Sequence, residues 1–224
     1  MKYPFLAFTI LVFTLVSCHP NPEKKAIVPM ELTTFDTIKL LAPDTIGGVP
    51  FMQALQHRRT DREFDKKNLS LKHLSEVLWA ANGLNRPDGK RTVPSAMALY
   101  PIQTYAVLVN GIYFYNPVTN QLEPVVEGDY REITGLQSFV KDAPLNLLFI
   151  ADFKAYDGDK KVAEEDRVSL ASLDAGHCSE NVYLYCASEG LKTVVRGRSQ
   201  PDELYKVLKM NAKYKFILAQ TVGY

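Results

Sequence analysis

Three arginines and a threonine lie within five consecutive residues of this chain, inside the segment 57–64, whose sequence is HRRTDREF. Arginine presents a planar fork of N–H donors that suits phosphate oxygens and carboxylates. The segment follows a short apolar stretch that we expect to be helical, built from Val49, Phe51, Met52 and Leu55. A basic cluster at the end of a helix is either a solvated patch or an anion-binding site. Charge runs on their own favour the solvated patch, so the decision rests on residues farther along the chain.

Two further segments carry chemistry. Residues 94–101 (PSAMALYP) combine prolines with small side chains, which allow a backbone to approach a planar ligand closely. Residues 181–184 (NVYL) lie on a long predicted helix that stops at Gly190-Leu191.

Together, and in this order, the three segments resemble the FMN-dependent nitroreductase family, and most closely its thiazoline/oxazoline dehydrogenase-like branch. The resemblance covers roughly residues 48–224. It implies an α+β fold with a central mixed or antiparallel sheet flanked by helices, and FMN bound at a homodimer interface. It also implies a small-molecule substrate and two-electron transfer through the flavin.

The resemblance assigns roles residue by residue. Arg58 and Arg59 match contacts to the FMN phosphate and ribityl chain, and Thr60 matches the hydroxyl donor beside them. Arg62 matches a base at the flavin pyrimidine edge, where a cation stabilises the reduced flavin. Pro94, Ser95 and Ala96 match the turn that approaches the partner subunit's flavin. Val195, Arg196 and Gly197 match the loop whose backbone N–H faces flavin N5.

The chain departs from the family pattern in two places. Met97 and Ala98 stand where the family often has Gly or Asn, and Met97 is bulkier. No basic residue follows Lys215, although many members carry bases near the C-terminus that complete the phosphate site. The phosphate would then depend on Arg58 and Arg59, with Arg196 or Arg198 as further candidates.

Two residues on the long helix lie four apart and share one face, His177 and Asn181. Asn181 aligns with the family's helix asparagine, and we expect it to make an interhelical hydrogen bond. His177 is a candidate general acid, although a lone histidine near Leu173 and Leu184 is more often a satisfied interior residue.

The first 18 residues are predicted to be a lipoprotein signal peptide. Lys2 precedes an apolar run from Phe5 to Val16, which ends in the lipobox-like sequence LVSC with Cys18 as the lipidated residue. The alternatives are an uncleaved anchor or an ordinary signal peptide. Residues 19–47 would be a tether and an extended lead-in, and residues 48–224 the nitroreductase-like domain. We expect a bacterial cell-envelope protein, lipid-anchored outside the cytoplasm and facing the periplasm, where free NAD(P)H is not expected.

Net charge and cysteine content limit the binding partners and covalent links that we expect. The 224 residues carry a formal net charge of +1, so no global basic surface points to nucleic acid. Apart from Cys18, the cysteines are Cys178 and Cys186, about 12 Å apart along one predicted helix, which is too far for a disulfide. We expect both to be buried thiols, and we expect no metal site.

The predicted elements place these residues as follows. Ser70 begins a helix that Gly83 ends, with His73 solvated and Trp79 in the core. Asn110-Gly111 predicts a type I′ hairpin. Helices are predicted at about 49–57, 130–140, 168–189 and 202–208 with a short one after Pro94, and strands at 104–109, 112–115, 122–126, 144–151, 192–195 and 216–219.

A second class of function remains open, namely a flavin-fold relative that has lost catalysis and serves as a binding lipoprotein. The absent C-terminal bases and Met97 favour it.

Overall fold

Seven strands form one antiparallel sheet in the computed structural model, which describes residues 28–158 and 162–224. Every neighbouring pair runs antiparallel, so the mixed alternative is excluded for these strands. In spatial order the strands are β1 (Ile38–Lys39), β4 (Gln121–Glu127), β3 (Gly111–Asn116), β2 (Ile102–Leu108), β5 (Leu145–Asp152), β7 (Tyr214–Gly223) and β6 (Lys192–Arg196).

The central strand β5 explains why the sheet is covered on both faces. Its side chains alternate between two apolar clusters, as the two-residue period of a strand requires. Leu147 and Phe149 face the cluster that includes helix residues Leu74 and Val182. Leu148 and Ile150 face the cluster on the opposite side of the sheet.

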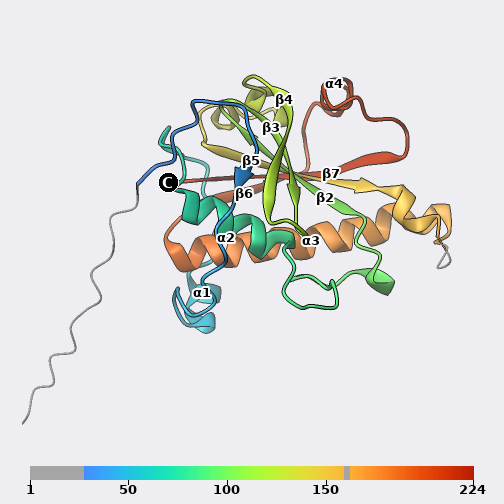
Figure 1. The fold of residues 1–224 in the computed structure, drawn as a ribbon, viewed down its shortest axis with the longest axis horizontal. Coiled ribbons are helices and arrows are strands. Elements are labelled where there is room, and N and C mark those ends of the chain that lie inside the picture. The colour runs from blue at the N-terminus through green and yellow to red at the C-terminus, as the bar shows by residue number, and fades with distance from the viewer. Residues whose placement is uncertain (1–27, 159–161) are drawn as a thin grey trace, which may run out of the picture.

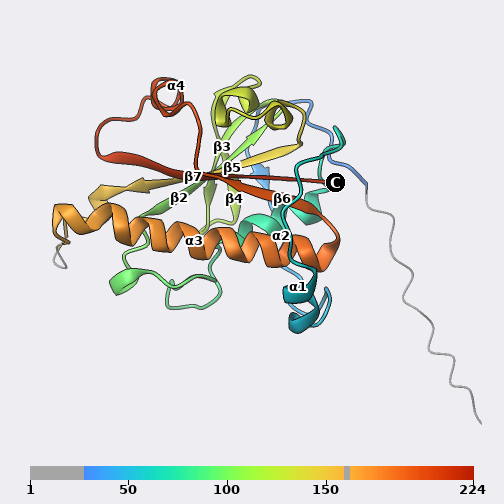
Figure 2. The same cartoon turned by 180° about the vertical axis from the view of Figure 1, so that it is seen from behind.

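Two long helices cover one face of the sheet (Figures 1 and 2). They are α2 (Leu71–Asn82) and α3 (Glu164–Glu189). The shorter helix α1 (Phe51–His57) lies on the side of α3 away from the sheet, and α4 (Pro201–Val207) lies on the other face of the sheet. Four 3-10 turns complete the elements: η1 (Ala96–Ala98), η2 (Arg131–Thr134), η3 (Ser138–Lys141) and η4 (Phe153–Tyr156).

The predicted helix ends agree with the structure. The Ser70 hydroxyl accepts the His73 backbone N–H at 3.1 Å and so begins α2. Gly83 follows its last residue. Gly190 ends α3 in the left-handed conformation at φ 72°, which glycine adopts without a Cβ penalty.

Two local predictions were wrong. Residues 130–140 form no continuous helix, but two 3-10 turns, η2 and η3, with an extended Gly135 between them. The hairpin between β2 and β3 exists, yet its loop is Val109-Asn110, and neither residue has the positive φ that a type I′ turn needs. Gly111 is the first residue of β3, and a Cβ there would collide with the Phe35 ring, so the glycine serves close packing.

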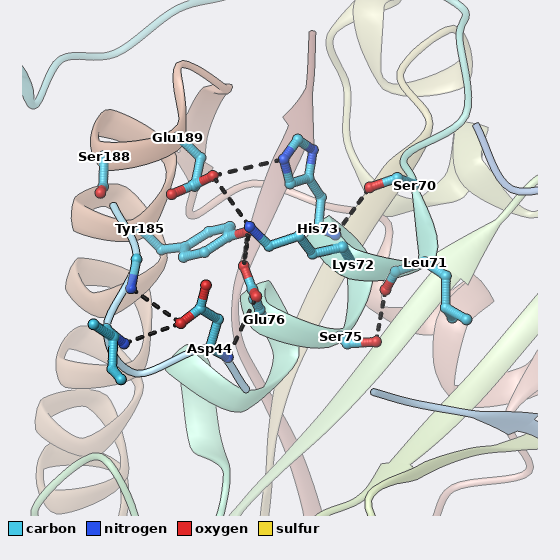
Figure 3. Close-up of polar contacts among 12 residues, drawn as sticks. Asp44, Ser70, Leu71, Lys72, His73, Ser75, Glu76, Tyr185, Ser188 and Glu189 are labelled. Carbon is cyan, nitrogen blue, oxygen red and sulfur yellow. Dashed lines mark hydrogen bonds and ion pairs between the residues drawn. The ribbon is translucent and has the colours of Figure 1, made fainter. Parts of the chain in front are cut away.

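The prediction that His73 is solvated was also wrong. Its side chain is buried between α2, the last turn of α3 and the C-terminal residue. Figure 3 shows the His73 ring directed at Glu189 on α3. Nδ1 lies 3.2 Å from the Tyr224 hydroxyl, and Nε2 lies 3.9 Å from a Glu189 carboxylate oxygen. Burial lowers the pKa of His73, although nearby Glu76 opposes the shift. The helical wheel of α2 could not show this second covered side, because the covering residues are distant in sequence.

The lead-in packs over the domain, as predicted, and adds strand β1 to the sheet edge. Phe35 and Leu40 pack against the larger core cluster. The Leu41 N–H donates to the Ser75 hydroxyl at 2.9 Å, and the Val49 N–H donates to the Ser188 hydroxyl at 2.9 Å. The segment is therefore fixed to both α2 and α3 before α1 begins.

The predicted signal peptide, Cys18 and the first part of the tether lie outside the described residues. Within the described ranges, no helix combines the length and apolar character that crossing a bilayer requires.

Candidate functional site

Helix α1 delivers the arginine segment to the C-terminal half of α3. The helix ends at His57, and the Arg58 N–H still donates to Ala54 O at 2.9 Å. From there the chain turns so that the Arg58 guanidinium lies 5.4 Å from the centre of the Tyr183 ring. This distance is within the range of a cation–π contact. The exposed arginine is therefore held against a defined surface and does not extend freely into solvent.

Tyr183 joins the predicted segments and was missed by the sequence analysis. Its hydroxyl lies 3.0 Å from the Thr60 hydroxyl and accepts the Val195 N–H at 3.0 Å. A second tie runs beside it, because the Asp61 N–H donates to Thr193 O at 3.0 Å. The arginine segment is thus attached along the outer edge of β6.

A cavity of about 510 Å³ opens between α1, the end of α3 and β6. We call it the Arg58 cavity. Its volume falls within the range of small-molecule sites. Twelve residues line it: Gln56, His57, Arg58, Arg59, Asp61, Tyr183, Cys186, Ala187, Gly190, Leu191, Lys192 and Thr193.

The cavity has an excess of positive charge. The Arg59 Nε donates to the Asp61 carboxylate at 3.0 Å, so that pair is largely balanced. Arg58 and Lys192 have no ion pair among the residues that the structure describes. Their charges suit an anion, and Lys192 supplies a cation that the sequence analysis had not assigned. The donor set therefore fits a phosphate, even though the chain lacks basic residues after Lys215.

Arg196 is in the interior, contrary to its predicted role at the cofactor. It is 4% exposed. Its Nε donates to Thr221 Oγ1 at 3.1 Å and its Nη2 to Asn146 Oδ1 at 2.8 Å. Its Nη1 donates to Thr134 O. Burial lowers the pKa of Arg196 to about 10. The guanidinium links β6, β7, β5 and η2, and its donors are directed away from any phosphate at the surface.

The other residues of the predicted N5 loop lie at the surface. Val195 is partly exposed, but its N–H is already donated to Tyr183. Gly197 is exposed, and a Cβ there would meet no atom within 4 Å, so a ligand could approach its backbone. Arg62 is exposed and does not line the Arg58 cavity.

The turn at residues 94–101 contacts a different part of α3. The Ser95 hydroxyl donates to Asp174 Oδ2 at 2.6 Å and accepts the Tyr100 N–H at 2.9 Å. Burial raises the pKa of Asp174. Asp174 and Tyr183 are nine residues apart on the helix, hence about 14 Å along its axis. Figures 1 and 2 show α1 and this turn beneath separate stretches of α3. One chain therefore does not bring Pro94, Ser95 and Ala96 to the arginine segment.

The same turn is strained. Met97, Ala98 and Tyr100 have φ of 53°, 56° and 46°, in the left-handed region that disfavours a Cβ. The short helix predicted after Pro94 is only the 3-10 turn η1. This conformation explains why Gly or Asn would suit positions 97 and 98, and it occurs at a predicted ligand contact, where such strain is often found.

The two polar residues of α3 have different environments. Asn181 donates to Ala80 O at 2.9 Å, which confirms the predicted hydrogen bond between α3 and α2. His177 is exposed, so the interior alternative was wrong. Leu173, one turn earlier on α3, is exposed as well.

The remaining candidates concern sulfur and metals. Cys178 and Cys186 are buried and unpaired, as predicted. Burial raises the pKa of both thiols, that of Cys178 to about 12. Within the described chain, no group of three or more His, Cys, Asp or Glu side chains is arranged to hold a metal ion.

Comparison with known proteins identifies relatives along most of the chain. The model of the nitroreductase family matches residues 55–224. A putative nitroreductase of Methanocaldococcus jannaschii is 30% identical over 193 residues, which are 82% of this chain and 95% of the relative.

Solved structures agree with this match. A putative nitroreductase from Ralstonia eutropha superposes with a TM-score of 0.80 at 40% identity, covering 88% of this chain and 93% of that one. A putative nitroreductase from Desulfovibrio desulfuricans, solved in complex with FMN, has a TM-score of 0.56 at 19% identity, covering 79% of this chain and 87% of that one. The second likeness concerns the fold alone.

Proposed function

Because the chain belongs to the nitroreductase family, we propose that it is an FMN-dependent oxidoreductase that moves two electrons to or from a small organic substrate. The observation that carries the proposal is the Arg58 cavity, where Arg58 and Lys192 lie without carboxylate partners among the described residues. Relatives that bind FMN, such as the Desulfovibrio desulfuricans protein, make this cofactor the natural occupant.

The residues of this chain would bind the cofactor's phosphate and position its ring. Arg58 and Lys192 would bind the phosphate dianion, with Arg59 beside them. The cation–π contact with Tyr183 holds Arg58 in place before the ligand arrives, which reduces the entropy lost on binding. Thr60, fixed by the Tyr183 hydroxyl, is the predicted donor to the ribityl chain.

Bound FMN supplies the redox chemistry by accepting and releasing two electrons. The protein contributes electrostatics, since exposed Arg62 would place a positive charge where the flavin gains negative charge. Gly197 leaves its backbone open to the ring. His177 is exposed on α3, where a substrate could reach it, and it is the candidate general acid.

The separation of the two motifs supports a homodimer. The Ser95 turn lies about 14 Å along α3 from Tyr183, so Pro94, Ser95 and Ala96 would reach the flavin of a second subunit. The surfaces beside α3 support this arrangement. Phe51 is 64% and Met52 72% exposed on α1, and Leu173 is 58% exposed on α3. Large exposed apolar side chains such as these are candidates for burial between subunits.

The finer identity rests on sequence motifs. We assign the chain to the thiazoline/oxazoline dehydrogenase-like branch from the segments at 57–64 and 94–101. The lipobox at Cys18 supports a lipoprotein held on the cell envelope outside the cytoplasm, facing the periplasm. The electron donor would then be an organic substrate or a quinol, because free NAD(P)H is not expected there.

Two measurements test the proposal. The purified protein should show flavin absorption bands, or gain them when FMN is added. A colourless protein that cannot be reconstituted would contradict the enzyme assignment. Anaerobic stopped-flow mixing with NADPH should leave the flavin oxidised on the millisecond-to-second scale, and rapid bleaching would contradict the extracytoplasmic donor.

The second candidate is a binding lipoprotein without catalysis. The strained Met97 and Ala98, at positions where the family often has Gly or Asn, favour it. A binding lipoprotein predicts that a menaquinol analogue or an organic donor does not reduce bound FMN. The oxidoreductase predicts that one of these two donors does.

A further inference from the structure

A second cavity lies beside the C-terminal end of α2 and shares no lining residue with the Arg58 cavity. Its volume is about 180 Å³. It is enclosed by the end of α2, the loop before β2, strands β2 and β3, and the turn η4 that follows β5. We call it the Arg91 cavity. Its lining includes Asn82, Arg91, Tyr100, Gln103, Phe114 and Asp152.

Arg91 is the unusual group in this cavity. Its guanidinium is partly buried and stacks over the Tyr100 ring at 4.9 Å. Its Nη1 donates to Ile102 O at 3.5 Å, a hydrogen bond too long to be strong. Across residues 28–158 and 162–224, no carboxylate forms an ion pair with it. Burial correspondingly lowers its pKa.

The other partly buried arginines of the chain are compensated. Arg131 donates to Asp129 at 2.7 Å, and Arg167 pairs with Asp157 at 3.0 Å. A desolvated charge without a partner is unfavourable, so such groups are usually paired or bind a ligand. Arg91 is partly exposed and donates one long hydrogen bond to the protein, so its guanidinium has donors available to a ligand.

The rest of the cavity restricts the ligand. Tyr100 supplies an aromatic surface under the guanidinium, and Phe114 and Tyr115 are further aromatic residues of the lining. Asp152 adds a negative charge, and its carboxylate is held by Gln103 Nε2 at 3.2 Å and the Lys154 N–H at 3.0 Å. A second anionic group on the ligand would meet Asp152. The small volume excludes nucleotides and other large molecules.

We propose that the Arg91 cavity binds a small monocarboxylate, with its carboxylate on the Arg91 guanidinium and its apolar part beside the Tyr100 ring. A planar guanidinium matches a carboxylate through two parallel hydrogen bonds. The site is independent of the proposed FMN site, and the inference holds whether or not the protein binds flavin.

The test is isothermal titration of the purified full chain with benzoate, benzamide and 4-phenylbenzoate. Benzamide has the shape of benzoate without its charge, and 4-phenylbenzoate keeps the charge but is longer than the cavity accommodates. We expect saturable benzoate binding that is at least about tenfold tighter than that of either of the other two compounds.

Variants locate the site. Arg91→Lys keeps the charge and loses the planar fork, and it should weaken benzoate at least about tenfold. Lys90→Gln removes the neighbouring exposed charge, which pairs with Asp88 at the surface, and should leave benzoate binding unchanged. Arg58→Gln should also leave it unchanged, which distinguishes this site from the Arg58 cavity.

Equal binding of benzoate and benzamide would overturn the proposal, as would the absence of benzoate binding or retention of full affinity in Arg91→Lys. If Arg91→Lys fails to fold, the comparison of the three compounds on the unmodified chain still decides the question. Loss of benzoate binding in Arg58→Gln would move the carboxylate to the other cavity and would equally refute it.

Discussion

Replacing Arg196 by methionine separates a structural arginine from a cofactor arginine. The side chain donates to Thr221, Asn146 and Thr134 in the interior. Hydrogen bonds from a charged donor contribute about 1.5–3 kcal/mol each, so three contribute roughly 5–9 kcal/mol. Burying the charge opposes this. The fall of its pKa from 12.5 to about 10 corresponds to about 3 kcal/mol.

The expected net loss for Arg196→Met is therefore about 2–6 kcal/mol in the free energy of unfolding. Methionine fills part of the volume but leaves the Thr134 carbonyl without this donor, which accounts for much of the loss. Urea denaturation followed by circular dichroism measures it, with flavin-free protein so that ligand binding does not contribute. Arg58→Met is the matched control, since Arg58 is exposed and should change stability by less than about 1 kcal/mol.

The affinity for FMN should show the opposite pattern in the same two variants. At a temperature where both are folded, Arg58→Met should bind FMN weakly and Arg196→Met should bind it almost as well as the parent. The reasoning is refuted if Arg196→Met keeps its stability within about 0.5 kcal/mol and loses FMN, because the guanidinium would then serve the phosphate after all.

Three further predictions follow from individual residues. Ala98→Gly should stabilise the protein by about 0.5–1 kcal/mol, because Ala98 is exposed with φ 56°, whereas the control Ala96→Gly should destabilise it; thermal melting that ranks them otherwise contradicts the strain. Because burial lowers the pKa of His73 below 6.5, the folded state binds fewer protons than the unfolded state under acidic conditions, so stability should fall as the pH drops below 6.5. That fall should be smaller in His73→Gln, and parallel urea midpoints between pH 7 and pH 5 would count against it. Cys178 and Cys186 should resist iodoacetamide in the folded protein and react in urea, as mass spectrometry of their peptides would show; rapid labelling of native Cys178 would argue against its buried thiol with a pKa of about 12.

Local patterns predicted most of the elements because each has a local cause. The Ser70 cap, the Gly190 stop and the apolar period of β5 depend on neighbouring residues and backbone sterics. The helix expected at 130–140 failed for a related reason, since Gly135 is extended and divides it into two turns.

Long-range contacts explain the site residues that the sequence could not assign. Arg196 looks functional as a charge beside Gly197, and only the fold brings Thr134 and Asn146 to it from 62 and 50 residues away. Tyr183 lies in the segment 181–184 without an assigned role, and only the fold places its hydroxyl between Thr60 and Val195. Lys192 became a candidate because it lines the same cavity as Arg58.

The central claim is that the Arg58 cavity binds the phosphate of FMN, and the affinity ratio between FMN and riboflavin tests it most directly because riboflavin lacks only the phosphate. Fluorescence titration should give the parent protein at least about a tenfold preference for FMN. Arg58→Gln should abolish that preference while leaving riboflavin affinity nearly unchanged. The control Arg86→Gln, which removes an exposed arginine outside the cavity, should keep it. Equal affinities for the two flavins in the parent, or an unchanged ratio in Arg58→Gln, would contradict the assignment.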